Sequence, residues 1–310
     1  MSLHSCPLCG GTGREPIYRT RDRHYKIPGE WVVARCTGCG LVQIDPMLRT
    51  EELMPLYPTD FYAYQDLVPA SQSFKAKLAR WLFPSLHVGD PPLAKPGRVL
   101  DSGCGTGWGL LQFRAKGWEC VGVEPSTAAA KFGREHYQLD IKAGTVNTER
   151  FPDLHFDYIR ANHSLEHDPD PGATLGEFHR ILKQGGKLLI GVPNIESAPA
   201  RLFGRYWWYL GAPVHTYNFS RRHLVRLLGK HGFEVESVRY CGNWGGLAGS
   251  LQIYLNRNRP EKVSLEGWFV NSRLCRLAAQ LISAVFNLFH QGDAIEVVAH
   301  PRPAGTSPAR

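Results

Sequence analysis

The feature that most constrains the fold of this chain is an alternation of short apolar runs and helical stretches that begins at Arg98. Such alternation is typical of β-α-β units, in which helices connect parallel strands. The expected strands are Val99–Leu100, Cys120–Val123, Phe156–Ala161 and Lys187–Val192, and the expected helices lie near Trp108–Lys116, Thr127–His136 and Gly172–Leu182. The sequence therefore predicts an α/β domain with a mainly parallel sheet and helices on both faces.

The segment Arg98–Gly107 is an expected strand that runs into a glycine-rich turn and then a helix. Glycines let the backbone pass close under a ligand, and the first amides of a helix are free to bind it. Enzymes that bind NAD or FAD use similar turns, so this pattern alone is weak. Glu124 ends the next expected strand, where a carboxylate can accept hydrogen bonds from both ribose hydroxyls. The turn and the carboxylate together predict a nucleoside site.

Four ordered motifs resemble those of class I methyltransferases that depend on S-adenosylmethionine (SAM). They are Val-Leu-Asp-Ser-Gly-Cys-Gly-Thr-Gly at 99–107, Gly-Val-Glu-Pro-Ser at 122–126, Phe-Asp-Tyr-Ile-Arg-Ala-Asn-His-Ser-Leu-Glu-His at 156–167, and Ile-Leu-Lys-Gln-Gly-Gly-Lys-Leu-Leu-Ile-Gly-Val-Pro-Asn at 181–194. The resemblance implies a Rossmann-like fold with a seven-stranded, mainly parallel sheet, and SAM as the methyl donor.

The resemblance also implies which residues contact the donor. Asp101 and the glycine turn would face its methionine part, Glu124 would hold the ribose, Asn162 and His163 would border the sulfonium, and the segment around Thr145 would lie near adenine. The residues expected to bind SAM are Asp101, Gly103, Cys104, Gly105, Gly107, Glu124, Pro125, Thr145 and Asn162. Asp157, at the start of its strand, is expected to be a structural hydrogen-bond acceptor.

Four of the eight cysteines form two Cys-x-x-Cys pairs near the N-terminus, Cys6 with Cys9 and Cys36 with Cys39. Each such turn presents two thiolates from one tight loop, and two pairs supply the four ligands of tetrahedral zinc. A redox dithiol or an iron–sulfur cluster is the alternative. All four ligands would come from protein, so we expect a structural Zn²⁺ that stabilises a segment too small to bury a core.

Three histidines are candidates for the general base that removes the acceptor proton, because imidazole titrates near neutral pH. His163 and His167 follow the fourth expected strand, and His215 precedes an expected helix, Arg221–His231, that Ser220 could cap. Structural roles remain open for all three. The aromatic run Arg205–Leu210 before His215 could stack on a sugar or ring, or could form a small satellite core.

The whole arrangement resembles bacterial methyltransferases that carry an N-terminal two-pair zinc segment and act in sugar, glycan and secondary-metabolite pathways. One subgroup methylates carbon of nucleotide-linked deoxysugars and has a further C-terminal domain that is absent from this sequence. We therefore expect a small-molecule or glycan acceptor methylated at oxygen or nitrogen.

The balance of Lys+Arg 36 against Asp+Glu 28 gives a net charge of +8 and an isoelectric point near 9.1. A basic chain permits an acidic partner but does not demand one. One alternative is an RNA methyltransferase that recognises RNA through the zinc ribbon. Against it, Asn162–Leu165 is not a base-flipping turn and no basic-aromatic stripe appears, so we expect no nucleic-acid partner. A non-catalytic SAM-binding protein is the other alternative.

The expected organisation is a zinc ribbon at 1–45, a connector and substrate-side cap at 46–96 with a helix at Phe74–Phe83, a methyltransferase domain at 97–303, and a disordered tail at 304–310. The domain includes a helical insertion at about 245–290 and late strands at Phe233–Tyr240 and Ala294–Ala299. Because the chain opens on Met1–His4 without a basic and apolar leader, we expect a cytoplasmic protein.

The apolar pattern of Ser272–His290 predicts an amphipathic helix within that insertion, with Arg273 and Arg276 at one end. It could be a core helix, a dimer contact or a surface that docks on the inner membrane face to reach a lipid-linked glycan. The sequence leaves the oligomeric state open.

Overall fold

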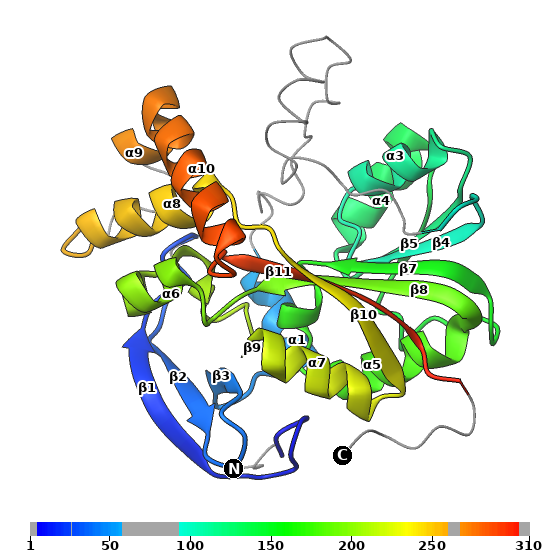
Figure 1. The fold of residues 1–310 in the computed structure, drawn as a ribbon, viewed down its shortest axis with the longest axis horizontal. Coiled ribbons are helices and arrows are strands. Elements are labelled where there is room, and N and C mark those ends of the chain that lie inside the picture. The colour runs from blue at the N-terminus through cyan, green and yellow to red at the C-terminus, as the bar shows by residue number, and fades with distance from the viewer. Residues whose placement is uncertain (1–4, 26, 58–92, 260–266, 304–310) are drawn as a thin grey trace.

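The structure is a computed structural model that describes residues 5–25, 27–57, 93–259 and 267–303. A seven-stranded sheet crosses the molecule in the order β10-β11-β8-β7-β4-β5-β6 (Figure 1). Its strands are β4 (Arg98–Ser102), β5 (Glu119–Glu124), β6 (Asp140–Ala143), β7 (Phe156–Asn162), β8 (Leu182–Pro193), β10 (Phe233–Tyr240) and β11 (Ala294–Pro301). Strands β4 to β8 pair in parallel, whereas β11 is antiparallel to both β8 and β10.

The predicted mainly parallel sheet is confirmed, with each expected strand within a few residues of its predicted position. The main difference is β8, which begins at Leu182 and not at Lys187, so the residues between the expected helix and the expected strand lie within the strand. A further strand, β6, lies where the sequence has only one short apolar stretch. Its central residue Ile141 is buried, and the strand is held at the sheet edge by pairing with β5.

Helices cover both faces of this sheet (Figure 1). On one face lie α3 (Trp108–Arg114) and α4 (Thr127–Tyr137), and on the other lie α5 (Pro171–Ile181) and α7 (Arg221–Lys230). Each helix buries an apolar stripe against the strands, for example Phe113 of α3 and Phe178 of α5. Ser220 caps α7 as predicted, because its hydroxyl accepts the amide hydrogen of His223.

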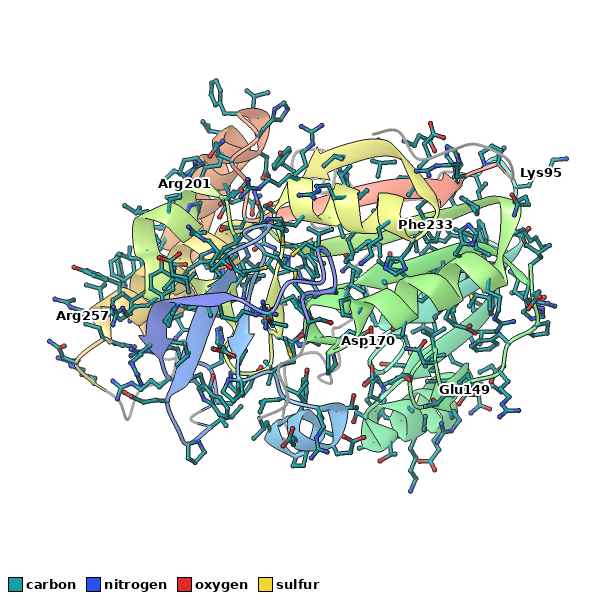
Figure 2. The ribbon with its side chains drawn as sticks, turned by 90° about the horizontal axis from the view of Figure 1, so that it is seen from below. Lys95, Glu149, Asp170, Arg201, Phe233 and Arg257 are labelled. Atoms are coloured by element: carbon teal, nitrogen blue, oxygen red, sulfur yellow. The ribbon has the colours of Figure 1, made fainter. Side chains whose placement is uncertain are left out.

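A second, antiparallel sheet joins the N-terminal segment to the rest of the chain. Its order is β1-β2-β3-β9, with strands β1 (Arg14–Thr20), β2 (Trp31–Cys36), β3 (Val42–Asp45) and β9 (Tyr217–Asn218). Since β9 belongs to the segment between β8 and α7, the N-terminal strands pair directly with the domain that follows them. Figure 2 shows these blue N-terminal strands lying along the side of the molecule.

The aromatic run before His215 forms part of a satellite core under this second sheet. Trp207 is 2% exposed, packs with Val33 and Ile44, and donates its Nε1 hydrogen to Asp293 at 2.8 Å. This region contains α6 (Ala198–Phe203) and two 3-10 turns, η5 (Gly204–Tyr206) and η6 (Trp208–Leu210). The satellite-core alternative therefore holds for Trp207.

The C-terminal insertion is helical, as predicted, with α8 (Trp244–Leu255), α9 (Trp268–Asn271) and α10 (Arg273–Leu288). Figure 1 shows these helices extending from one end of the sheet. No helix among the described residues combines the length and the apolar character needed to cross a bilayer. Before the main domain, α1 (Thr50–Leu53) and the 3-10 helix η1 (Met54–Leu56) lead to Tyr57. The predicted helix Phe74–Phe83 and the predicted tail 304–310 lie outside the described residues.

Candidate functional site

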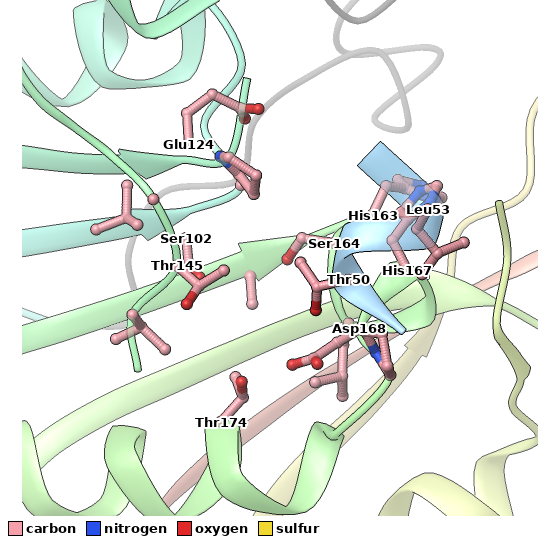
Figure 3. A pocket seen from close by; sticks show the side chains of 18 of the residues that line it. Thr50, Leu53, Ser102, Glu124, Thr145, His163, Ser164, His167, Asp168 and Thr174 are labelled. Carbon is pink, nitrogen blue, oxygen red and sulfur yellow. The ribbon is translucent and has the colours of Figure 1, made fainter. Parts of the chain in front are cut away.

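A pocket opens at the carboxyl ends of β4, β5 and β7, the edge where parallel sheets bind ligands. It encloses about 990 Å³ of empty space, counting its open mouth. Figure 3 shows Glu124 and Thr145 at one end and His163 and His167 at the other. The predicted site residues on its lining are Gly103, Gly105, Glu124, Pro125, Thr145, His163 and His167.

The carboxylate of Glu124 lies against the glycine turn. Its Oε2 accepts the amide hydrogen of Gly105 at 2.8 Å, and its Oε1 accepts that of Ser126 at 2.8 Å. The side chain is 5% exposed, and burial raises the pKa of this carboxyl group. Each carboxylate oxygen has a second lone pair, so Glu124 can still accept hydrogen bonds from a ligand in the pocket.

Gly103 allows the turn to approach the opposite wall of the pocket. Its φ is +73°, a conformation that L side chains rarely adopt. A Cβ at this position would lie 2.5 Å from the Cβ of Ser164, so a larger residue would collide with the loop after β7. Both the positive φ and the short distance to Ser164 therefore require glycine at position 103.

Four of the residues predicted to bind SAM are absent from the pocket lining. They are Asp101, Cys104, Gly107 and Asn162. Asp101, 1% exposed, accepts two hydrogen bonds of 2.9 Å from Nη1 of Arg160, its neighbour across β4 and β7. Asn162 lies close to Gly191 on β8, where an added Cβ would meet its Oδ1 at 2.2 Å.

Asp101 therefore has a structural partner, Arg160, that no sequence motif predicted. Burial raises the pKa of its carboxyl group, while the adjacent guanidinium of Arg160 opposes that shift. A buried carboxylate without a cation would be costly, so the pair fixes the end of β4 just before the turn. Asp157 behaves as predicted, accepting the amide hydrogen of Arg98 at 2.8 Å at the start of the sheet.

His163 lies at the other end of the pocket in an unusual conformation. Its φ is +52°, which is uncommon for a residue other than glycine and often marks a functional constraint. Its Nδ1 lies 3.1 Å from Oε1 of Glu166, which is 1% exposed. A carboxylate only accepts, so Nδ1 carries the hydrogen and Nε2 keeps a lone pair. The ring of Tyr209 stacks on His163 with centroids 6.1 Å apart.

His167 and His215 are more deeply buried than His163. Their rings meet edge to face, with centroids 4.6 Å apart. Burial lowers the pKa of His167 to about 4 and that of His215 to about 3, so both rings are uncharged at neutral pH. His167 lines the main pocket, whereas His215 lines a smaller neighbouring cavity.

Several polar residues of the pocket were not predicted. The hydroxyl of Tyr57 lies 2.8 Å from Nδ1 of His167, and Asp168 and Thr174 face the cavity between its two ends (Figure 3). Burial raises the pKa of the Asp168 carboxyl group. Asp168 directly follows the Leu-Glu-His motif and could have been suspected from it, but Tyr57 is 110 residues from His167 in sequence and carried no such signal.

The four cysteines of the N-terminal pairs meet at one point. Their sulfur atoms all lie within 4.8 Å of one another, and Cys6 to Cys39 and Cys9 to Cys36 are each 3.5 Å apart. Four sulfurs at about 2.3 Å from a tetrahedral ion would lie about 3.8 Å apart. The donor set and its spacing therefore fit a tetrahedral metal.

The sequence model of a family described as "Methyltransferase domain" matches residues 74–238. The chain belongs to this methyltransferase family. The match includes β4 to β8 and most of β10, and with them most of the pocket lining; Thr50, Leu53, Met54 and Tyr57 line the pocket from outside the matched residues.

Three curated relatives are similar to this chain over the methyltransferase region. A Mycolicibacterium smegmatis protein named "Probable S-adenosylmethionine-dependent methyltransferase" is 30% identical over 48% of this chain and 57% of its own length. The ubiquinone biosynthesis O-methyltransferase of Bradyrhizobium sp. is 38% identical over 40% of this chain and 51% of its own. The malonyl-[acyl-carrier protein] O-methyltransferase of Erwinia pyrifoliae is 33% identical over 40% and 49%. The chain spans about half the length of these relatives.

The fold is also found among solved structures, and one of these is compared with this chain. It is a chain of the complex between the Haloferax volcanii Trm112 methyltransferase activator and a methyltransferase, with a TM-score of 0.50, 16% identity, and coverage of 73% of this chain and 93% of that chain. At this identity the likeness supports the fold alone.

Proposed function

We propose that this methyltransferase-family chain is an enzyme that transfers a methyl group from SAM to oxygen or nitrogen of a small-molecule or glycan acceptor. The observation that carries the proposal is a single pocket with Glu124 and the glycine turn at one end and the His163–Glu166 pair at the other. One end suits a nucleoside donor, and the other end suits removal of an acceptor proton.

At the donor end, Glu124 would accept hydrogen bonds from the ribose hydroxyls, and the turn around Gly103 and Gly105 would lie beneath the methionine part. Thr145 lines the same end and would lie near adenine. Asp101 would support the turn without contacting SAM, because its carboxylate is paired with Arg160. The lining of the pocket and the class I resemblance support these proposed placements.

At the acceptor end, His163 is the best placed of the three histidines to act as general base. Its Nε2 lone pair is free to take a proton from an acceptor hydroxyl or amine, and Glu166 would stabilise the imidazolium that forms. As the proton leaves, the acceptor's electron pair forms a bond to the methyl carbon and the carbon–sulfur bond breaks, which leaves S-adenosylhomocysteine. His167 and His215 suit this role less, because their low pKa values make them weak bases.

The chemistry of the relatives supports an oxygen or nitrogen acceptor. Two of those named above are O-methyltransferases, and a Triticum aestivum relative, 34% identical over 39% of this chain and 26% of its own length, is named phosphoethanolamine N-methyltransferase. A general base is useful for acceptors that must lose a proton as the bond forms. A glycan or secondary metabolite with a free hydroxyl fits this requirement.

Replacing Glu124 tests the donor end. We expect Glu124→Gln and Glu124→Ala to weaken SAM binding by about 10- to 100-fold, because a charge-assisted hydrogen bond to the ribose is lost. Calorimetric titration of SAM measures the change. Glu119→Ala, at the exposed start of the same strand, is the matched control and should bind SAM like the parent. Unchanged affinity in both Glu124 variants would overturn the placement of the ribose.

Replacing His163 tests the acceptor end. We expect His163→Gln to lower kcat by about 100- to 10,000-fold while SAM affinity stays within a few-fold of the parent, because only proton removal is impaired. Labelled SAM with cell extract as the acceptor source, followed by mass spectrometry of the product, gives the rate. The exposed His136→Gln is the control. If His163→Gln transfers methyl at the parent rate, His163 is not the base. If the parent protein binds SAM but transfers no methyl group, the chain is a SAM-binding protein without this activity.

We further propose that the four cysteines hold a structural Zn²⁺. Cys39 supports α7 through its carbonyl, which lies 3.2 Å from Nε2 of His223, so the metal would stabilise the junction between the N-terminal segment and the main domain.

We expect Cys9→Ser to lose one equivalent of zinc per chain relative to the parent and to lower the Tm, because three thiolates hold the ion less firmly. Elemental analysis and thermal unfolding measure both effects. Cys275→Ser, which replaces an isolated cysteine on α10, should keep the parent zinc content. Equal zinc in Cys9→Ser and the parent would contradict the assignment.

A further inference from the structure

Glu166, His167 and His215 form a cluster at the acceptor end of the pocket, in which Glu166 and His215 are buried and His167 lines the pocket. One carboxylate oxygen and one nitrogen of each ring lie within 4.8 Å of one another. Two imidazoles and one carboxylate are a donor set for divalent transition metals, and three protein ligands leave positions open for a substrate.

The hydrogen bonds of the two rings prepare them to bind a metal. Nδ1 of His215 lies 2.8 Å from the carbonyl oxygen of Tyr209, and Nδ1 of His167 lies 3.0 Å from that of Val214. A carbonyl only accepts, so each Nδ1 carries the hydrogen and each Nε2 keeps its lone pair. The hydroxyl of Tyr57, 2.8 Å from Nδ1 of His167, accepts from the same hydrogen in this arrangement. Histidines that bind metals commonly donate their other ring hydrogen to a backbone carbonyl in this way.

Glu166 supplies the second, independent observation. Its Oε1 accepts the hydrogen bond from His163, but its Oε2 is buried and has no hydrogen-bond partner within the described structure. The residue is 1% exposed, and a buried carboxylate oxygen without a partner is costly. A cation beside Oε2 would remove that cost.

We propose that Glu166, His167 and His215 bind a divalent transition metal whose open positions take an oxygen atom of the acceptor. At metal–ligand bonds of about 2.1 Å, binding would draw the three side chains closer together. His167 lines the pocket, so the metal lies next to the acceptor end. There it orients an acceptor hydroxyl and favours its ionisation, while His163 receives the proton. The acceptor role rests on the proposed function; the metal site itself does not.

Co²⁺ titration of the zinc-loaded protein, followed by visible absorption, tests the site. We expect one Co²⁺ per chain with d–d bands but without a near-ultraviolet sulfur-to-cobalt band, because the ligands are nitrogen and oxygen. His215→Ala and the isosteric Glu166→Gln should weaken Co²⁺ binding at least about tenfold, in line with loss of one ligand. The matched controls, His136→Ala and Glu135→Gln, replace an exposed adjacent Glu-His pair on α4 and should bind like the parent.

Absence of Co²⁺ binding in the parent, or equal binding in parent and Glu166→Gln, would overturn the proposal. SAM affinity and zinc content show that each variant is folded. If the parent binds Co²⁺ but transfers no methyl, the proposed function fails and the metal site stands; if it transfers methyl without binding Co²⁺, only the metal site fails.

Helix α10 exposes its large apolar side chains and buries small and polar ones, the reverse of an ordinary surface helix. The side buried against the protein carries Ala279, Gln280 and Ser283. The exposed side carries the large apolar residues of the helix and its C-terminus, which are Leu274, Leu277, Leu281, Ile282, Val285, Leu288 and Phe289. Such a helix needs a covering surface, because large contiguous apolar patches are rare on free soluble proteins.

Further large apolar side chains are exposed on neighbouring elements. Trp268 on α9, Leu255 at the end of α8 and Leu202 on α6 are exposed at 66%, 47% and 71%. Every charged residue described between 244 and 289 is an arginine, namely Arg257, Arg259, Arg273 and Arg276. Figure 2 places Arg201 and Arg257 at the same end of the molecule.

We propose that the exposed apolar side of α10 docks on an anionic lipid surface. Interfacial helices combine an apolar face with basic residues and bind anionic headgroups. The described residues 244–259 and 267–289 carry four arginines and no acidic side chain, and an anionic headgroup supplies the opposite charge. Charge complementarity therefore favours lipid.

Flotation with vesicles of phosphatidylglycerol and phosphatidylcholine tests this docking. We expect the parent to float with these vesicles, to float less with phosphatidylcholine alone, and to lose flotation in Leu281→Asp. Leu154→Asp, at another exposed leucine outside the face, is the matched control and should float like the parent. No flotation of the parent, or a parent dimer in sedimentation analysis that Leu281→Asp abolishes, would overturn the proposal.

Discussion

The carboxylate of Glu124 and the two amides it binds, those of Gly105 and Ser126, define the edge of the sheet on which the pocket depends. The turn after β4 and the turn after β5 both leave the sheet at this edge, and the Glu124 side chain links them. The amides of Gly103 and Cys104 also donate to the carbonyl of Val123, at 2.8 and 3.2 Å, so the turn is ordered before a ligand binds and less conformational entropy is lost on binding. Beneath the turn, the ion pair between Asp101 and Arg160 links β4 to β7.

The N-terminal segment contributes to the acceptor side of the molecule and not only to its own stability. β3 pairs with β9, and the amide of Ile44 donates to the carbonyl of Thr216 at 3.0 Å. The hydroxyl of Thr216 in turn donates to the carbonyl of Glu166 at 2.9 Å. The chain that carries His215 is thus held between the N-terminal sheet and the loop after β7, so a metal at the four cysteines would stiffen a frame that includes the acceptor end.

The three candidate histidines differ mainly in burial. His163 is partly exposed and has a carboxylate behind it, whereas His167 and His215 are buried against each other, which keeps them uncharged at neutral pH. An uncharged, oriented imidazole is a weak base but a good metal ligand. In this proposal His163 removes the proton, and His167 and His215 position the acceptor through the metal.

Local sequence patterns determined the strand–turn–helix units, the glycine turn, Glu124 and the cysteine pairs, because each is a short-range property of backbone conformation, apolar periodicity or ligand spacing. Tertiary structure alone decided which side chains meet. It turned Asp101 toward Arg160 and away from the pocket, brought Tyr57 to His167, and paired β9 with the N-terminal sheet. Such contacts depend on packing between segments distant in the chain, and neither periodicity nor motif spacing within one segment encodes them.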